Sequence, residues 1–335
     1  MKELSWEDIY KDLRNKVYYP VYLLMGEEPF YIDVISKYIE ENVLSDSEKE
    51  FNQTVLYGRE TDVNTVISAA KRYPMMSNHH VVIVKEAQNL RDIENLDAYI
   101  RNPLPSTILT ICYKYKSFDK RKSFYKNLGK VGVILESKKL YENEMPGWIA
   151  GYVKRSGYKI GDKASQLLAD NLGTELGKVV NELKKIYISL PKASEITSAI
   201  IEENIGISKD FNVFELQDAL GSKDSFKAFQ IVKYFADNPK SNPIVVTLGL
   251  LNTFFIRLVL YHSLKDKSQR NVASELKISP YFVSGIQKAA ANYPLSKLID
   301  IFADLRVYDL RSKGVNNNST PHGELLKELV FKILN

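Results

Sequence analysis

Five short apolar runs in the first 140 residues, each separated from the next by an amphipathic stretch, constrain the fold of this chain more than any other feature. The runs are rich in Val, Ile and Leu and lie at residues 21–25, 51–58, 80–87, 107–113 and 131–136. Strands that are buried on both faces have such nearly continuous apolar sequences. The stretches between them, such as FYIDVISKYIEENVL, have the apolar spacing of a helix. This alternation predicts a parallel sheet that is covered by helices.

The strand-like runs stop near residue 140. The segments that follow, among them MPGWIAGYVKRSGY and ELGKVVNELKKIYISL, have helical spacing and end at Gly or Pro. Thr197 is the predicted N-cap of ITSAIIEENIG. From residue 211 onward the pattern is again helical, with breaks at NPKSNP and GVNNNSTPHG. We therefore predict an α/β domain at 1–140, a small helical domain at 141–209 and a larger helical domain at 210–335.

Composition and charge set broad limits on the function. The formal net charge of +5 permits contact with nucleic acid without demanding it. The only cysteine, Cys112, excludes an internal disulfide and fits a reducing compartment. The segment MKELSWEDIYKDL has no apolar signal core, and Arg257 interrupts the longest apolar stretch, which favours a buried helix over a membrane span. We expect a cytoplasmic protein that binds no membrane.

The segment YLLMGEEPFYID at residues 22–33 has the order strand, turn and helix, in which nucleotide-binding proteins hold phosphate. A loop of the form G-x-x-x-x-G-K-[ST] needs its second Gly for close backbone approach, its Lys for charge and its hydroxyl for Mg²⁺. Aligned on Gly26, this chain has other residues at all three positions, namely Tyr31, Ile32 and Asp33. Glu27 and Glu28 add negative charge, and one like-charge contact at about 4 Å costs roughly 4 kcal/mol at an effective dielectric of about 20.

The acidic residue that would hold Mg²⁺ at the end of the third core strand is also missing. The segment VVIVKEA places Lys85 and Glu86 there, and a lysine cannot hold the metal. The two defects together predict a nucleotide-hydrolase scaffold whose loop at Gly26 binds no phosphate. A glycine followed by acids at a helix start also needs no function at all, because acids favour a helix N-terminus.

Four segments carry a family resemblance, and they follow one another at natural spacing. They are VYLLMGEEPFYID, YPMMSNHHVVIVKEAQNL, SFDKRKSFYKNLGKVGVILE and, near the C-terminus, ELKISPYFVSGIQKAAANYPLSKLIDIFADLRVYDLRSKG. Together they make the chain resemble, over essentially its whole length, the delta subunit of the bacterial DNA polymerase III clamp loader. The resemblance implies an AAA+-like α/β domain, then a helical lid domain and a helical collar domain that serves oligomerisation.

The resemblance also implies a function. Members of this family bind the ring-shaped sliding clamp and open one of its interfaces, so that the clamp is loaded onto primed DNA in chromosome replication. They act in a pentamer with the clamp-loader ATPase subunits and a delta-prime subunit, and DNA is a partner within the assembled complex. They bind no ATP themselves, so neither a cofactor nor intrinsic catalysis is expected, although the polymerase III holoenzyme is a DNA-directed DNA polymerase. An active AAA+ ATPase with an atypical site is the alternative.

The resemblance places the main clamp contact at Met75 and Met76 in KRYPMMSNHH, where the family more often has Leu-Phe or Phe-Phe. Methionine is unbranched and polarizable and suits an adaptable apolar pocket. Pro74 is expected to end the preceding helix and to present both side chains on a turn, with Tyr73 in support. Two methionines before a strand are also common core residues, but the flanks SNHH and AAKRY favour an exposed corner.

The stretch YKYKSFDKRKSFYKNLGK at 113–130 is basic and carries aromatic residues between its charges. Such stretches bind nucleic acid, which makes Lys120, Arg121 and Lys122 candidate DNA contacts. A solvated helix face is the commoner explanation. In that case Asp119 pairs locally with Arg121, and four apolar residues face the domain core, namely Phe118, Phe124, Tyr125 and Leu128.

The segment NVASELKISPYFVSGIQKAA at 271–290 resembles a helix-turn-helix in which Pro280 begins the second helix. It supports the alternative of a helical DNA-binding regulator. Its two lysines are few for groove recognition, so an ordinary helix hairpin is preferred. His79 and His80 point to opposite faces of an extended segment, and no ligand spacing typical of zinc includes them, so no metal site is expected.

Overall fold

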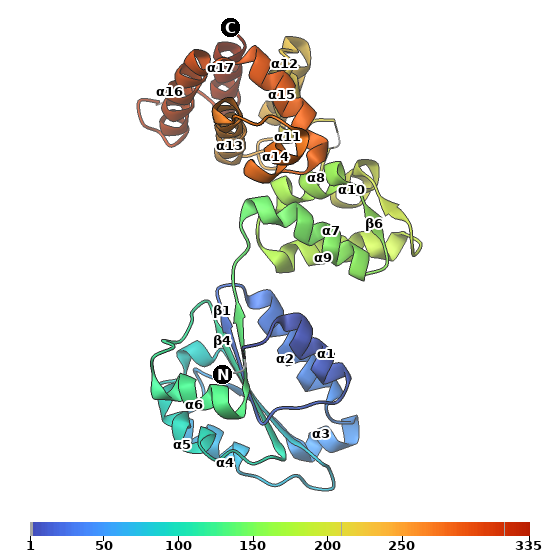
Figure 1. The fold of residues 1–335 in the computed structure, drawn as a ribbon, viewed down its shortest axis with the longest axis vertical. Coiled ribbons are helices and arrows are strands. Elements are labelled where there is room, and N and C mark those ends of the chain that lie inside the picture. Colours follow the sequence, from blue (N-terminus) through green and yellow to red (C-terminus); the bar gives the residue numbers. More distant parts are fainter. Residues whose placement is uncertain (1–2, 209, 318) are drawn as a thin grey trace. The chain divides into compact units, whose positions relative to one another are not determined.

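The structure is a computed structural model that describes residues 3–208, 210–317 and 319–335. It divides into two compact units, Met1–Leu140 and Tyr141–Asn335, which are described separately (Figure 1). The further boundary between a lid and a collar at residues 209 and 210 stays a prediction.

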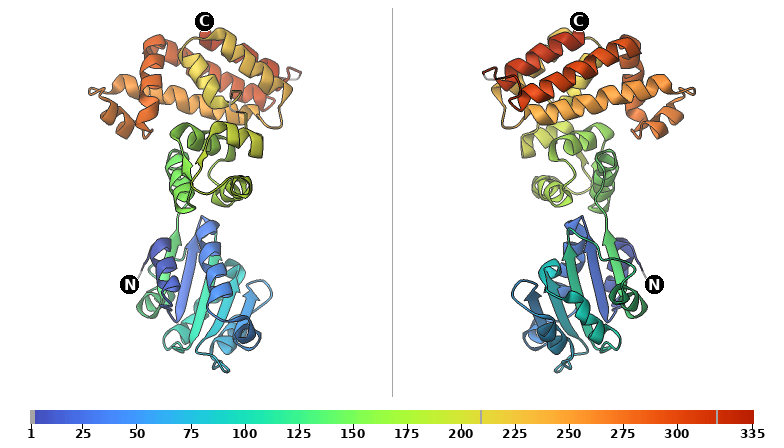
Figure 2. Two further views of the ribbon diagram at one scale, coloured as in Figure 1. Left: turned by 90° about the vertical axis from the view of Figure 1, so that its right-hand side faces the viewer. Right: turned by 90° about the vertical axis from the view of Figure 1, so that its left-hand side faces the viewer.

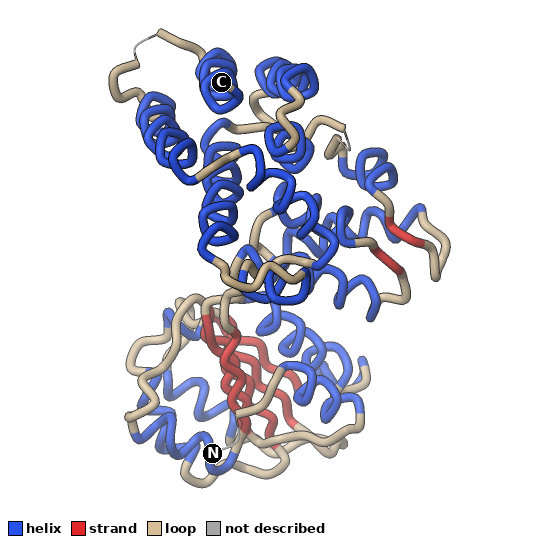
Figure 3. The backbone as a smooth tube through the Cα atoms, turned by 45° about the horizontal axis from the view of Figure 1, so that its top comes forward, coloured by secondary structure: helices blue, strands red, loops and turns tan. Residues whose placement is uncertain are grey.

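A five-stranded parallel sheet forms the centre of the first unit, in the order β2-β3-β4-β1-β5. The strands are β1 (Val21–Gly26), β2 (Gln53–Tyr57), β3 (His80–Lys85), β4 (Thr107–Lys114) and β5 (Val133–Ser137). They are drawn in red in Figure 3. The parallel sheet predicted from the apolar runs is therefore confirmed.

Helices cover both faces of this sheet (Figure 2). They are α1 (Trp6–Arg14), α2 (Pro29–Asn42), α3 (Asp46–Asn52), α4 (Val63–Ala70), α5 (Asp97–Ile100) and α6 (Ser123–Val131). Successive residues of β1 enter opposite cores, as the alternation of side chains along a strand requires. Val21, Leu23 and Met25 pack with α4, α5 and α6, whereas Tyr22 and Leu24 pack with α1 and α2.

The second unit is almost entirely helical. Its helices are α7 (Met145–Arg155), α8 (Asp162–Leu172), α9 (Leu176–Ser189), α10 (Ser198–Ile205), α11 (Val213–Gly221), α12 (Ser225–Asp237), α13 (Ile244–Ser263), α14 (Gln269–Glu275), α15 (Val283–Asn292), α16 (Leu295–Ser312) and α17 (His322–Leu334). Thr197 caps α10 as predicted, because its hydroxyl accepts a hydrogen bond from the Ile200 N–H. The expectation that no strand follows residue 140 is wrong: β6 (Lys159–Ile160) pairs in parallel with β7 (Glu195–Ile196).

By length and composition, α13 is the one helix in the described part of the chain that is apolar enough to cross a membrane. The core helix of a globular protein passes the same test. Leu251, Phe255 and Leu258 of α13 are fully buried in the helical core, where they pack with residues of the neighbouring helices.

Three element boundaries differ from those predicted. Residues Phe51 and Asn52 end α3 and do not begin a strand, so β2 starts at Gln53. Helix α4 ends at Ala70, before Pro74 is reached. The helix expected across RDIENLDAYI is a 3₁₀ turn at Ile93–Leu96 followed by the short α5. Local apolar spacing did not distinguish these cases.

Candidate functional site

The turn between α4 and β3 carries the methionine pair. Pro74 restricts the backbone of the residue before it, which disfavours a helical conformation at Tyr73. Helix α4 nevertheless ends earlier, at Ala70, with Lys71 as its C-cap. The pair therefore lies on a turn, as expected, but this turn begins earlier than the proline because the helix has already ended at Ala70.

The side chains of this turn are exposed. Tyr73 is 75% exposed, Met75 63% and Met76 103%. Met76 has a φ of +52°, in the left-handed region that residues with a side chain rarely adopt. The two methionines are thus apolar side chains exposed to solvent, and they are not part of the core.

Helix α3 holds this turn, and the sequence reasoning did not assign it any role. The buried side chain of Asn52 accepts a hydrogen bond from the Met75 N–H at 2.7 Å and donates one to the Met75 carbonyl at 2.9 Å. Phe51, its neighbour in the chain, is 65% exposed. The local signal for α3 was present: Ser45 and Glu48 have the spacing of a capping box, and the Glu48 carboxylate accepts from the Ser45 N–H at 2.8 Å.

The turn between β1 and α2 has the backbone of a tight strand–helix connection. Gly26 has a φ of +135°, and a Cβ placed on it would lie 2.0 Å from the Ser137 carbonyl oxygen, so only glycine fits. Its N–H donates to the Lys116 carbonyl at 3.0 Å, and the Glu28 N–H donates to the Ser137 carbonyl at 3.2 Å. Two amides of this turn, which would be candidates to face an anion in a phosphate-binding loop, are therefore already hydrogen-bonded within the chain.

The N-terminus of α2 is occupied by the protein itself. Glu28 is the N-cap, and its buried carboxylate accepts a hydrogen bond from the Phe30 N–H at 2.9 Å. Pro29 occupies the first helical position and has no N–H to offer. A helix N-terminus attracts anions through its unpaired N–H groups and its dipole, and here a carboxylate of the chain takes that place.

The three positions that carry Gly, Lys and Ser or Thr in a phosphate-binding loop have packing and pairing roles. The Tyr31 ring stacks on Trp6 with 4.7 Å between centroids, and Ile32 is fully buried. Asp33 pairs with Lys114 at 2.6 Å. Lys114, on β4, is thus a cation close to the loop, and its charge is already balanced by Asp33.

The three basic residues directly before α6, which were the candidate DNA contacts, are each paired with an acid. Arg121 pairs with Asp119 at 2.8 Å, as expected. Lys120 donates to Glu136 at 3.0 Å and to Glu3 at 3.2 Å, and these two carboxylates raise the pKa of its ammonium group. Lys122 pairs likewise with an acid, Glu94. Exposed ion pairs contribute at most about 1 kcal/mol, so DNA phosphates would be able to replace these acids.

The apolar residues of the same stretch are buried as predicted, namely Phe118, Phe124, Tyr125 and Leu128. The segment at 271–290 forms α14, a 3₁₀ turn at Pro280–Phe282 and α15. Val272, Val283 and Ile286 bury it in the helical core, so it packs as a helix hairpin within the bundle. Within the described ranges, no group of three His, Cys, Asp or Glu side chains is placed to hold a metal ion.

Comparison with known proteins decides the family. The sequence profile described as "DNA polymerase III, delta subunit" matches residues 22–138, and that described as "DNA polymerase III delta subunit, C-terminal domain" matches residues 210–327. The chain belongs to the DNA polymerase III delta subunit family. The DNA polymerase III subunit delta of Bacillus subtilis (strain 168) is 27% identical over 321 residues, which cover 91% of each chain.

A solved structure has the same fold as this delta-family chain. The Bacillus subtilis DNA clamp loader delta protein matches with a TM-score of 0.55 and 24% identity, over 98% of this chain and 99% of that one. The RuvB Holliday junction branch migration motor of Thermotoga maritima also matches, at 13% identity over 85% of this chain and 87% of that one. Its TM-score of 0.36 is too low to carry an argument.

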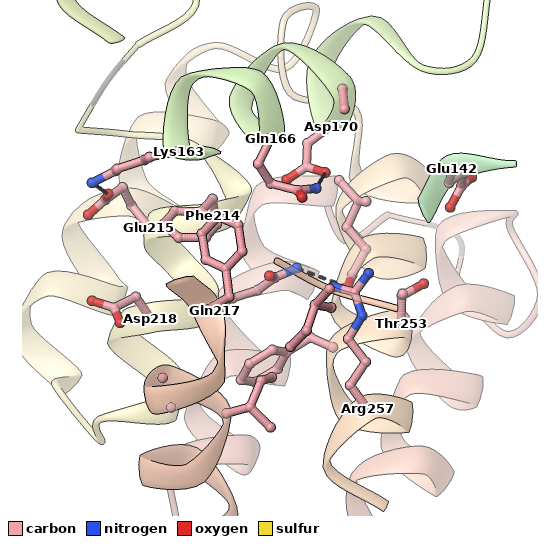
Figure 4. A pocket seen from close by; sticks show the side chains of 18 of the residues that line it. Glu142, Lys163, Gln166, Asp170, Phe214, Glu215, Gln217, Asp218, Thr253 and Arg257 are labelled. Carbon is pink, nitrogen blue, oxygen red and sulfur yellow. Dashed lines mark hydrogen bonds and ion pairs between the residues drawn. The ribbon is translucent and has the colours of Figure 1, made fainter. Parts of the chain in front are cut away.

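The helical unit of this delta-family chain contains a cavity of about 1070 Å³ that the sequence did not indicate (Figure 4). Residues of α8, α11, α13 and α15 line it, among them Asp170 and Arg257. The Asp170 carboxylate accepts a hydrogen bond from the Gln166 side chain at 2.7 Å. Burial raises the pKa of Asp170 to about 6, against the smaller opposing effects of Gln166 and Arg257. No local sequence pattern predicts that Asp170 and Arg257 line the same cavity, because they lie on different helices.

Proposed function

We propose that this delta subunit binds the sliding clamp through Met75 and Met76 and opens one of its interfaces for loading onto primed DNA. The observation that carries the proposal is the exposure of two methionines on a turn that the fold holds in place. Burial of one such side chain in an apolar pocket contributes about 1.5–3 kcal/mol. Tyr73 and Pro74 complete the proposed contact surface.

The opening step requires differential affinity. A ligand shifts an equilibrium only by the difference between its affinities for the two states. The surface around the turn must therefore fit the opened clamp better than the closed one. The amides of Gly26, Glu28 and Phe30 already have partners within the chain, and the loop has no lysine at the position of the phosphate-binding motif. ATP therefore acts in this proposal only on the partner ATPase subunits, where it controls access to the methionines.

The partners in this proposal are the clamp, the ATPase subunits and a delta-prime subunit, in a cytoplasmic complex that acts on DNA. The helices from α11 onward supply the collar contacts. They expose apolar side chains that a lone copy leaves in water, among them Ile299, Val307 and Phe331. Lys120, Arg121 and Lys122 supply DNA contacts within the complex.

The test is the affinity of purified sliding clamp for the wild type and for the Met75→Ala/Met76→Ala double variant, measured by surface plasmon resonance. We expect at least a tenfold loss, which corresponds to about 1.4 kcal/mol. Ile188→Ala is the matched control, because Ile188 is 88% exposed but lies on α9, in the other unit. Unchanged binding by a folded double variant would remove the site assignment.

The alternative activities have their own tests. Micromolar ATP binding with turnover by the isolated chain would favour an atypical ATPase. Sequence-specific duplex binding by the chain would favour a DNA-binding regulator. We expect neither, because the amides of Gly26 and Glu28 are already hydrogen-bonded within the chain and the 271–290 segment is packed in the bundle.

A further inference from the structure

Asn52 is bonded to the methionine turn through both ends of its side-chain amide. Its oxygen accepts from the Met75 N–H at 2.7 Å, and its nitrogen donates to the Met75 carbonyl at 2.9 Å and to the Glu48 carbonyl at 3.0 Å. Both amide hydrogens are therefore used. The partners also fix the orientation of the amide, because the opposite orientation would set donor against donor at the Met75 N–H.

These two hydrogen bonds have the same donor and acceptor pattern as a hydrogen-bonded residue pair in an antiparallel β-ladder. They fix the peptide groups on both sides of Met75 against α3, although Asn52 and Met75 lie 23 positions apart in the sequence. The next residue, Met76, has a φ of +52° and a fully exposed side chain. An unusual backbone conformation of this kind persists only where the surrounding structure over-determines it.

Further contacts attach the same turn to α3 and to the segment between α1 and β1. The Glu48 side chain interacts with Ser77, and hydrogen bonds from Ser45 and Ser77 lower the pKa of the Glu48 carboxyl. The ring of Tyr18 meets that of His79 edge-on at 5.1 Å between centroids. The turn is thus held on both sides of the exposed methionine pair.

We propose that Asn52 is a positioning residue for the clamp contact. It orders the backbone of Met75 and Met76 before the partner arrives, so that binding does not have to order it. The inference rests on the proposed function, because it assigns a role to Asn52 only through the two methionines. Asn52 itself is fully buried and does not reach the partner.

The expected effect follows from the ordering of one residue. Leaving the backbone of one residue unordered in the free protein weakens binding by a factor of about five to thirty. We expect Asn52→Ala to lower clamp affinity by this factor. Asn52→Ser keeps a hydroxyl at this position, but the shorter side chain cannot bond both the N–H and the carbonyl of Met75 as the amide does, so it serves if the alanine variant fails to fold.

The experiment is a double-mutant cycle on the full chain with purified clamp, combining Asn52→Ala with Met75→Ala/Met76→Ala. A positioning residue has no effect once the side chains that it positions are gone. Asn64→Ala, at an exposed asparagine on α4, is the matched control. Hydrogen exchange at the Met75 amide gives a second readout, and we expect that amide to lose its protection in the Asn52 variants.

The outcomes distinguish a failure of the positioning role of Asn52 from a failure of the clamp site at the methionines. Loss of affinity by Asn52→Ala in the wild-type background alone, with faster exchange at Met75, supports the positioning role. The positioning role would be overturned if Asn52→Ala lowered clamp affinity equally with and without the two methionines. It would also be overturned if Asn52→Ala had no effect while the methionine double variant bound weakly. Either result would leave the clamp site intact. Unchanged binding by the methionine double variant would overturn the clamp site and this inference together.

Discussion

The Asp170 carboxyl lies in a place that destabilises its charged form. It lines the cavity of the helical unit, and burial raises its pKa from the ordinary value of 3.8 to about 6. Its hydrogen bond from Gln166 and the charge of Arg257 oppose the effect of burial without cancelling it. Replacement by asparagine keeps the size and an oxygen acceptor for Gln166, and removes the charge. We therefore expect Asp170→Asn to stabilise the helical unit at neutral pH.

The direction and magnitude of the stability change follow from the difference in the pKa of Asp170 between the folded and the unfolded protein. Between pH 3.8 and about 6 the folded protein binds more protons at Asp170 than the unfolded chain does, so stability falls as the pH rises through this window. Above about pH 6 the carboxylate is charged in both states, and the destabilisation is complete. A difference of about two pH units corresponds to about 3 kcal/mol. We expect Asp170→Asn to gain about 3 kcal/mol at pH 7.5 and about half of that at pH 5.

Urea unfolding at the two pH values measures this gain. The chain has Trp6 in the α/β unit and Trp148 in the helical unit, so a Trp6→Phe background lets tryptophan fluorescence report the helical unit alone. Asp237→Asn, at an exposed position, is the matched control. A variant no more stable than its parent at pH 7.5, or a gain that is the same at pH 5, would show that the cavity does not impose the charge penalty that the burial of Asp170 indicates.

Two further predictions concern the α/β unit. Gly26→Ala places a Cβ 2.0 Å from the Ser137 carbonyl oxygen at a φ of +135°, and we expect thermal melting to show a loss of roughly 3 kcal/mol or more. Gly147→Ala, where no atom lies within 4 Å of the added Cβ, should cost nothing; an equal loss in both would refute the steric argument. Phe51→Ala should weaken clamp binding at least about threefold through lost apolar burial, with Ile188→Ala as control; unchanged affinity would limit the contact to the turn.

The sheet was predictable because its strands are buried on both faces. Their apolar runs are nearly continuous, and each is followed by a stretch of helical spacing, so the class of fold follows from local pattern alone. The exposed methionine turn was also predictable, since Pro74 and the polar flanks argue against a core position. The pairing of β6 with β7 was not, because two residues are too few to establish a period.

The parts of the site that sequence reasoning missed depend on contacts between distant positions. FNQTVLYG has the composition of a strand, yet α3, which begins at the capping box of Ser45 and Glu48, continues through Asn52. That shift of two residues puts Asn52 where its amide meets the backbone of Met75. No property of either segment alone specifies this contact. The same holds for Asp170, whose pKa depends on how the helices around the cavity pack.

The turn at Gly26 and the methionine turn differ in the edge of the sheet at which they lie and in the groups that they expose. All five strands are parallel, so the turn after β1 lies at the carboxyl edge of the sheet, where nucleotides bind in α/β folds. There the amides of Gly26 and Glu28 are already hydrogen-bonded within the chain. The methionine turn precedes β3 and lies at the amino edge, where its backbone is fixed and its side chains are exposed. Because the two turns lie at opposite edges of the sheet, a substitution at Gly26 and a substitution at the methionine pair are expected to act independently, since distant sites without shared contacts usually have additive effects.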